Sequence, residues 1–182
     1  MKNKKQNLII TSEEKELIEP EFFKYPSINL SLRQLCDIEL LLNGAFYPLT
    51  GFMNQNDYNS VVDSMRLGDG TLWPIPITFD VSHEVAKSIN IKDKIILRDQ
   101  ENFPLAIFIV SDIWEPELKK EALSVYGTSD DFHPGVNYLF NKVNRFYLGG
   151  TLKGLSLPRH FDYLNDRHTP HQLKQKFHKN KW

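Results

Sequence analysis

The spacing between apolar residues changes along the sequence, and this change limits the folds that the chain can adopt. Between Ser31 and Met65 apolar residues recur every three or four positions, as on one face of a helix. In "WPIPITFDV", residues 73–81, apolar residues alternate with Pro74 and Pro76 at intervening positions. Because proline has no backbone N–H to donate to a neighbouring strand, this segment is predicted to be a strand at a sheet edge or barrel rim.

A helix is predicted to begin after Ser31. The motif "SLRQ" has the form of a capping box, with Ser31 as N-cap and Gln34 three residues on. Asn43 and Gly44 supply a left-handed stop. The broad apolar face expected on this helix consists of Leu32, Leu35, Cys36, Ile38, Leu41 and Leu42.

The same rules predict further elements downstream. The first is a helix that carries Tyr58, Val61, Val62 and Met65, with Asn56 or Asp57 as its cap. A short helix at 82–90 and a hairpin at 94–114 that turns at 99–102 follow. The last are a helix at 115–127 with Pro116 in its first turn and two short strands around Gly149 and Gly150. Small helices interleaved with short strands and many turns predict an α+β fold with a compact mixed or barrel-like sheet.

The two ends of the chain differ from this central region. Residues 1–28 are predicted to form an arm with a short helix or extended segment, because Pro20 and Pro26 interrupt any long helix. Residues 161–182 end in a basic stretch whose "TP", Thr169 and Pro170, opens a helix. That helix has a thin apolar stripe, which predicts that the segment leads into a further domain.

Composition argues against several classes of protein. The formal net charge of -1 argues against a nucleic-acid or membrane partner, since such partners usually go with a basic excess. No apolar run approaches the roughly 18 residues that span a bilayer. Cys36 is the single cysteine, which excludes an internal disulfide and favours the cytoplasm. Its position among leucines predicts a buried thiol.

The pattern of residues assigns no catalytic, cofactor-binding or metal-binding residue. The four histidines near the end of the chain lack the i, i+4 spacing of a helical zinc pair and have no second cysteine, so loop and linker positions are favoured. These histidines are His160, His168, His171 and His178. The glycines of "GDGT" and "LGGT" match no phosphate-binding loop and are predicted to form tight turns.

Four stretches carry a resemblance to a known family. They run from "LSLRQLCDIELLLNGAFYPLTGFMNQNDYNSVVDSMRLGDGTLWPIPITFDV" through "HPGVNYLFN" and "YLGGTLKGLSLPRHFDY" to "RHTPHQLKQKF". In this order they resemble the N-terminal region of the ATP sulfurylase (sulfate adenylyltransferase) family, most closely its fungal-type members. The resemblance implies a PUA-like β-barrel domain at 29–160 with short peripheral helices. It also implies that "GAFYPLTGF", residues 44–52, packs the loop between the first helix and the barrel.

The resemblance also implies a function. Members of that family transfer the adenylyl group of ATP to sulfate in sulfate assimilation, giving adenosine 5'-phosphosulfate and pyrophosphate, with ATP and magnesium. Their chemistry lies in a second, nucleotidyltransferase domain, in Q-T-R-N-P, H-x-x-H and G-R-D motifs. Only His168 and His171 have one of these spacings, and their Thr-Pro context gives them no catalytic role. The chain is therefore expected to be an accessory or assembly module that does not catalyse alone.

The expected partner is the catalytic domain of the same enzyme, with a homo-oligomer also allowed. Residues 161–182 would form the linker and the start of that domain, with Leu173, Phe177 and Trp182 facing it. Two alternatives stay open. One is a stand-alone RNA-binding PUA-like module, against which the near-neutral charge counts, and the other is the non-catalytic half of a split enzyme. The sequence does not decide whether a kinase domain belongs to the full protein.

Overall fold

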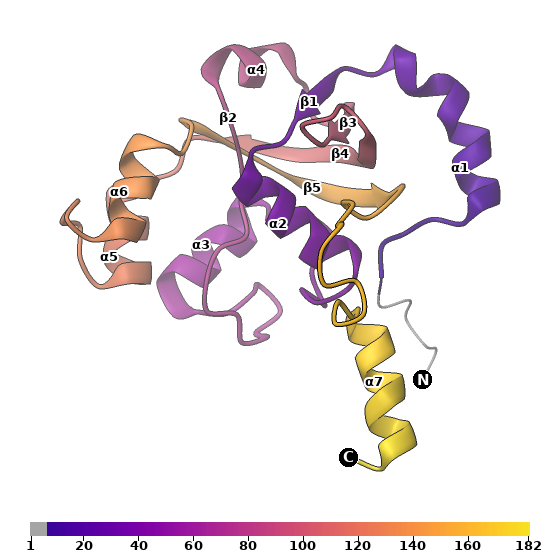
Figure 1. Ribbon diagram of the computed structural model, residues 1–182. Helices are drawn as coiled ribbons and strands as arrows, with labels where there is room; N and C mark the ends of the chain where they lie inside the picture. The colour runs from indigo at the N-terminus through magenta and orange to yellow at the C-terminus, as the bar shows by residue number, and fades with distance from the viewer. Residues whose placement is uncertain (1–6) are drawn as a thin grey trace. The chain divides into compact units, whose positions relative to one another are not determined.

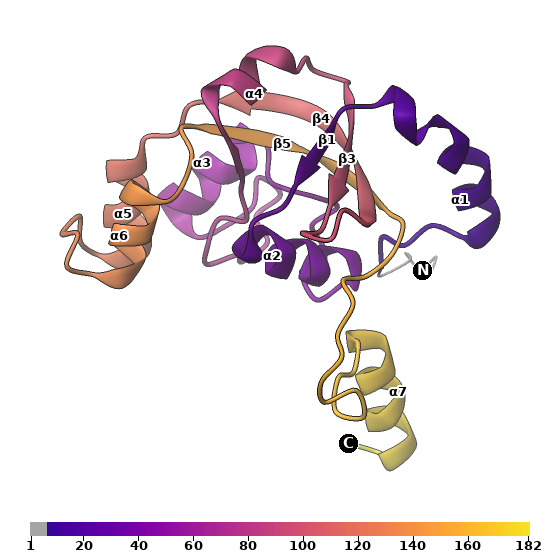
Figure 2. The same cartoon turned by 45° about the horizontal axis from the view of Figure 1, so that its top comes forward.

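Figures 1 and 2 show the computed structural model of the protein, which describes residues 7–182. The elements in chain order are α1 (Ser12–Ile18), the 3-10 helix η1 (Glu19–Lys24), β1 (Ser27–Asn29), α2 (Leu32–Leu42), α3 (Gln55–Ser64), β2 (Phe79–Val81), α4 (His83–Ser88), β3 (Lys94–Arg98), β4 (Pro104–Trp114), α5 (Leu118–Tyr126), α6 (Pro134–Asn141), β5 (Phe146–Gly154) and α7 (Pro170–Asn180).

The five strands form one mixed sheet in the order β1-β3-β4-β5-β2. β1 pairs with β3 in parallel, whereas β3 with β4 and β2 with β5 are antiparallel. The predicted α+β class with a mixed sheet is confirmed.

Two compact units divide the chain. The first comprises Met1–Gly51, Lys94–Ile109 and Leu152–Trp182, and the second comprises Phe52–Asp93 and Val110–Thr151. The boundary between Ile109 and Val110 falls inside β4, and the boundary between Thr151 and Leu152 falls inside β5. Each of these two strands therefore contributes residues to both units.

The short helix predicted in the N-terminal segment is present as α1. Thr11 caps it in a full capping box with Glu14, and Pro20 lies at the start of η1, where the chain changes direction. Residues 1–6 lie outside the described part. η1 inserts one buried ring into the first unit, in a cluster of Phe22, Ile96, Ile107 and Leu155. The strand β1 that follows was not predicted.

Helix α2 begins and ends where the sequence predicts. The Ser31 side chain accepts from the Gln34 N–H, the Gln34 side chain accepts from the Ser31 N–H, and Gly44 has a φ of 84°. The predicted burial of Cys36 is wrong, because its side chain is exposed. The buried positions are Gln34, Ile38, Leu41 and Leu42, which follow the i, i+4, i+7, i+8 pattern, and Cys36 lies off this stripe.

Replacing the cap of α2 should have a modest and local effect. We expect Ser31→Ala to lower the free energy of unfolding by about 1 kcal/mol, because the Gln34 N–H in the first turn loses its side-chain acceptor. Thermal or urea unfolding measures this loss, with the exposed Ser111 on β4 mutated to Ala as the control. Equal stability of the two variants would contradict the capping role.

The second unit corrects two predictions. The N-cap of α3 is Asn54, whose side chain accepts from the Asp57 N–H at 2.8 Å, so neither Asn56 nor Asp57 caps the helix. The strand expected over 73–81 is restricted to β2, because the two prolines before it cannot donate to a ladder. β2 does lie at a sheet edge, as those prolines predict.

The paired glycines of "LGGT" also differ from expectation. Gly149 and Gly150 lie inside the single strand β5, not in a turn between two strands. A Cβ on Gly149 would lie 2.6 Å from both the Asn54 Cα and the Met53 carbonyl oxygen, so glycine is needed here for close backbone approach. In "GDGT", by contrast, Gly70 has a φ of 87° and forms the predicted turn.

The remaining predicted elements are present. Ser82 caps α4, β3 and β4 form the hairpin, and Gly127 ends α5 in the left-handed conformation. α5 begins at Leu118, so Pro116 precedes the helix instead of lying in its first turn. α6 was not predicted, although Pro134 at its first position and His133 at its N-cap were available signals.

Candidate functional site

The stretch "GAFYPLTGF" places its aromatic rings in different environments. Phe52 is 2% exposed, whereas Phe46 is partly buried and Tyr47 is exposed. The Phe52 ring stacks on Phe79, with centroids 5.0 Å apart, and its carbonyl accepts from the Gly150 N–H at 3.0 Å. Phe52 thus packs against β2 and β5 within the second unit.

In the first unit, the segment after β5 is held against α2 by a polar contact. His160 Nε2 lies 2.9 Å from both carboxylate oxygens of Glu39, and the two side chains are 29% and 27% exposed. Because a carboxylate only accepts, Nε2 is the nitrogen that carries the proton.

A hollow of about 620 Å³ lies between α2 and the segment 157–169. Its size is in the range of small-molecule sites, but two of its charged groups have local partners. Arg167 donates to the Asp162 carboxylate at 2.9 Å, and His160 is paired with Glu39 as above. The α2 wall consists of Cys36, Glu39, Leu40 and Asn43, and the apolar part of the opposite wall consists of Leu157, Pro158 and Leu164. The hollow offers a partly apolar surface for another protein segment more readily than a set of groups for acid–base chemistry.

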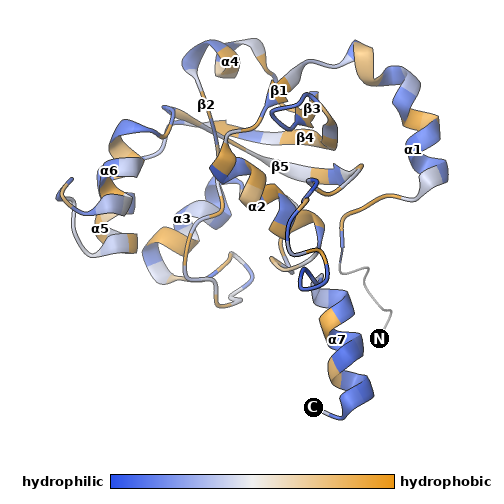
Figure 3. Ribbon diagram, in the orientation of Figure 1, coloured by the Kyte–Doolittle hydropathy of each residue, from blue (hydrophilic) through white to orange (hydrophobic). Residues whose placement is uncertain are grey.

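The C-terminal segment adds exposed apolar side chains near this hollow. Phe161, Tyr163 and Leu164 are 88%, 75% and 63% exposed. On α7 the stripe is thin and surrounded by hydrophilic residues, as Figure 3 shows. Phe177 and Trp182 are 44% and 82% exposed, with their ring centroids 6.1 Å apart. So much exposed apolar surface within a short segment indicates an interaction surface. We define the hollow and residues 161–182 together as the tail face.

Helix α7 should be loosely held in the isolated chain. Its few apolar contacts offset only a small part of a backbone ordering cost of about 1–2 kcal/mol per residue. Hydrogen exchange in dilute protein at high salt should therefore show fast exchange of amides 171–178 and slow exchange of amides 104–111 and 79–81. Strong protection across α7 in a monomer would contradict this prediction.

The structure places the four C-terminal histidines in separate contacts. His160 pairs with Glu39, His171 Nε2 lies 2.9 Å from the Gln175 side chain, and His168 contacts Lys176. Within residues 7–182, no group of three or more His, Cys, Asp or Glu side chains is arranged to hold a metal ion.

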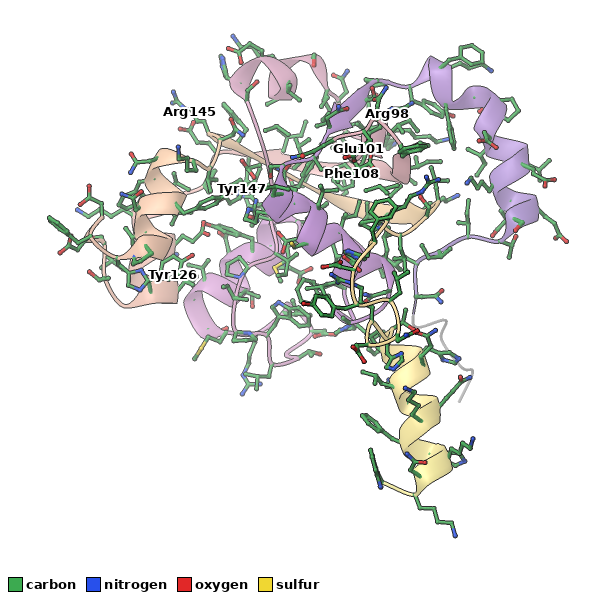
Figure 4. All side chains as sticks on the ribbon, viewed as in Figure 1. Arg98, Glu101, Phe108, Tyr126, Arg145 and Tyr147 are labelled. Atoms are coloured by element: carbon green, nitrogen blue, oxygen red, sulfur yellow. The ribbon has the colours of Figure 1, made fainter. Side chains whose placement is uncertain are left out.

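A buried polar cluster in the second unit was not found by sequence reasoning. Tyr58 and Tyr147, the latter labelled in Figure 4, both donate to Oε2 of the buried Glu121, at 2.8 and 3.1 Å. Burial, followed by the nearby Glu121, raises the pKa of both hydroxyls far above the usual range. Both therefore remain protonated donors at neutral pH. Because the three side chains are buried and satisfy one another, the cluster holds α3, α5 and β5 together.

The tail face was only partly predictable. The sequence pointed to Leu173, Phe177 and Trp182 as exposed apolar residues, but it missed the α2 wall of the hollow. Cys36, Glu39, Leu40 and Asn43 do recur at helical spacing, and this periodicity was the available signal. It was hidden because Cys36 was expected to point inward with the neighbouring leucines.

The fold and the comparisons define the class of this protein. The family model of the PUA-like domain matches residues 2–157. The chain belongs to the PUA-like domain family.

Comparison with curated proteins gives a more specific relation. The chain is 49% identical over 154 residues to the sulfate adenylyltransferase of Saccharomyces cerevisiae, covering 85% of this chain and 30% of that enzyme. It is 46% identical to the sulfate adenylyltransferase of Candida albicans (86% of this chain, 31% of the enzyme) and 43% identical to that of Schizosaccharomyces pombe (92% and 35%). The chain therefore spans about a third of these relatives and matches their N-terminal part.

The chain is also similar to part of a solved structure. The hexameric APS kinase from Thiobacillus denitrificans superimposes with a TM-score of 0.75 and 31% sequence identity, covering 97% of this chain and 30% of that chain. Among the described residues no helix has the length and apolar character needed to cross a membrane.

Proposed function

We propose that this chain is the N-terminal PUA-like part of a sulfate adenylyltransferase and that it serves its nucleotidyltransferase part as an accessory and assembly module. The observation that carries the proposal is the 49% identity over 154 residues to the yeast enzyme. The reaction, ATP and sulfate to adenosine 5'-phosphosulfate and pyrophosphate, would belong to that partner together with its ATP and magnesium. A cytoplasmic location is part of the proposal and rests on the single cysteine.

The tail face is the surface that we assign to the catalytic partner. It lies in the segment that would lead into the rest of such an enzyme, and it combines exposed apolar residues with a hollow of about 620 Å³. The APS kinase from Thiobacillus denitrificans is described as hexameric. Assembly of several copies of this chain is compatible with the assignment of the tail face to the catalytic partner.

A complementation experiment tests the proposal. The yeast sulfate adenylyltransferase without the region that this chain matches would be mixed with this chain, and sulfate-dependent pyrophosphate release from ATP would be measured. We expect no release by this chain alone, and binding together with increased release in the mixture. Robust sulfate-dependent release by the chain alone, or no binding at any concentration, would contradict the proposal.

Two matched variants locate the contact. Phe161→Lys should weaken binding of the catalytic part, because this 88% exposed ring lies on the tail face. Phe132→Lys is the control, since Phe132 is 94% exposed in the second unit. Equal effects of the two changes would contradict the tail-face assignment. A salt-dependent shift of RNA mobility by the chain would instead favour the RNA-binding alternative.

A further inference from the structure

A second hollow lies within the second unit, between α3 and the segment that leads from β4 into α5. Its volume is about 210 Å³, below the roughly 300–1,000 Å³ that is usual for small-molecule sites, so it suits a group of a few heavy atoms. The buried side chains of Tyr58, Val62 and Trp114 form its apolar wall. We call this feature the α3–α5 hollow.

The charged groups around the α3–α5 hollow leave one carboxylate without a partner. The Lys120 ammonium lies 2.7 Å from the Asp63 carboxylate, and Nε of Arg145, which Figure 4 labels, donates to the Glu115 carboxylate at 2.7 Å. Among residues 7–182, the exposed Glu117 carboxylate makes no hydrogen bond and no ion pair. Three carboxylates against two cations give the rim a net negative charge, which attracts a cation and repels an anion.

A buried donor in the wall of the hollow also lacks a partner. Trp114 is 6% exposed, and its indole N–H makes no hydrogen bond within the described part of the chain. A buried donor without an acceptor is destabilising, so a bound molecule that supplies an acceptor would be stabilised there. Gln55 and Asn59 add exposed side-chain amides at the rim, which can both donate and accept. A ligand that answers these features carries a positive charge with an acceptor oxygen close to it.

We propose that the α3–α5 hollow binds an α-ammonium group together with the carbonyl that follows it, as at the N-terminus of a peptide or in an amino-acid amide. The ammonium would lie beside the Glu117 carboxylate and the aromatic wall, since aromatic faces attract cations. The carbonyl oxygen would accept from the Trp114 indole N–H. A free amino acid fits less well, because its own carboxylate would face the acidic rim. The inference concerns the second unit and does not depend on the proposed catalytic partner or on the tail face.

Titration of the chain with small amines tests the proposal. Calorimetry would compare alaninamide, trialanine amide with a free N-terminus, the N-acetylated form of that peptide, and free alanine. We expect both free amines to bind, and N-acetylation to weaken binding of the peptide about tenfold or more because it removes the positive charge. Free alanine should bind more weakly than alaninamide. Equal affinity for the two free amines would identify a small amine as the ligand, and tighter binding of the peptide would identify a peptide N-terminus.

Two matched variants and one spectroscopic signal locate the site. Glu117→Gln should weaken binding of trialanine amide about tenfold. Glu101→Gln is the control, because Glu101 is an exposed acid of the first unit and the change in net charge is the same. In heteronuclear NMR the indole N–H signal of Trp114 should move on binding, whereas those of Trp73 and Trp182 should stay. Trp73→Phe and Trp182→Phe assign the three signals without a change in the wall of the hollow.

Four results would overturn the proposal. They are no binding of either free amine up to about 10 mM, equal binding of the N-acetylated peptide, equal effects of Glu117→Gln and Glu101→Gln, and a Trp114 indole signal that does not move. Circular dichroism of each variant checks that the fold is kept.

Discussion

Phe52→Ala is expected to lower the free energy of unfolding by about 3–5 kcal/mol, as for other buried phenylalanines truncated to alanine. The ring is 2% exposed and stacks on Phe79, which is itself fully buried. Its removal leaves a cavity beside Phe79 of β2, and the backbone cannot collapse freely because the Phe52 carbonyl also accepts from the Gly150 N–H. Equilibrium urea unfolding measures the loss.

Two other phenylalanines make this measurement specific. Phe46 belongs to the same loop but is only partly buried, so its truncation should cost clearly less than that of Phe52. Phe132 is 94% exposed, and Phe132→Ala should change stability by no more than about 0.5 kcal/mol. If Phe52→Ala behaved like Phe132→Ala, the packing role of the Phe52 ring would be wrong.

Glu121→Ala is expected to lower the free energy of unfolding by roughly 2–5 kcal/mol. The change leaves the buried hydroxyls of Tyr58 and Tyr147 without the carboxylate that accepts from both, and each unsatisfied buried donor costs about 1–3 kcal/mol. Both rings remain in place against Trp114, so the hydroxyls cannot simply turn to water. Chemical unfolding monitored by tryptophan fluorescence is a suitable measurement, since Trp114 packs on both rings.

A glutamate on the same stretch of chain provides the control. Glu117 is exposed, precedes α5 and makes no side-chain capping bond, so Glu117→Ala should be nearly neutral. Glu121→Gln keeps an acceptor oxygen and should cost less than Glu121→Ala. Equal losses for Glu117→Ala and Glu121→Ala would show that the buried cluster contributes nothing to stability.

Local features of this protein were predictable from sequence because their causes are local. Ser31 with Gln34, Thr169 with Pro170, and Gly127 act within one turn of the chain, so the ends of α2, α5 and α7 could be placed from residue type alone. The absence of a recognisable catalytic motif was likewise a property of the residues themselves. The resemblance to sulfate adenylyltransferases rested on residue order and needed no structure.

Long-range packing decided the rest. Cys36 is exposed because the neighbours of α2 cover the stripe through Ile38, and helical periodicity alone did not show which part of a broad apolar face would be covered. Gly149 lies inside a strand, although glycine pairs more often mark turns, and glycine is needed there because the backbone at Asn54 approaches it too closely for a Cβ.

The sequence by itself determined the fold class, both ends of α2, the end of α5, the start of α7 and the basic character of the tail, since each depends on residues close together in the chain. Only the tertiary structure decided the pairing of Tyr58 and Tyr147 on Glu121 and the hollow beside Glu39 and His160. The residues of these contacts are separated by 26 to 121 positions. Such contacts depend on how strands and helices pack, and the periodicity of one helix does not show which distant residues will face it.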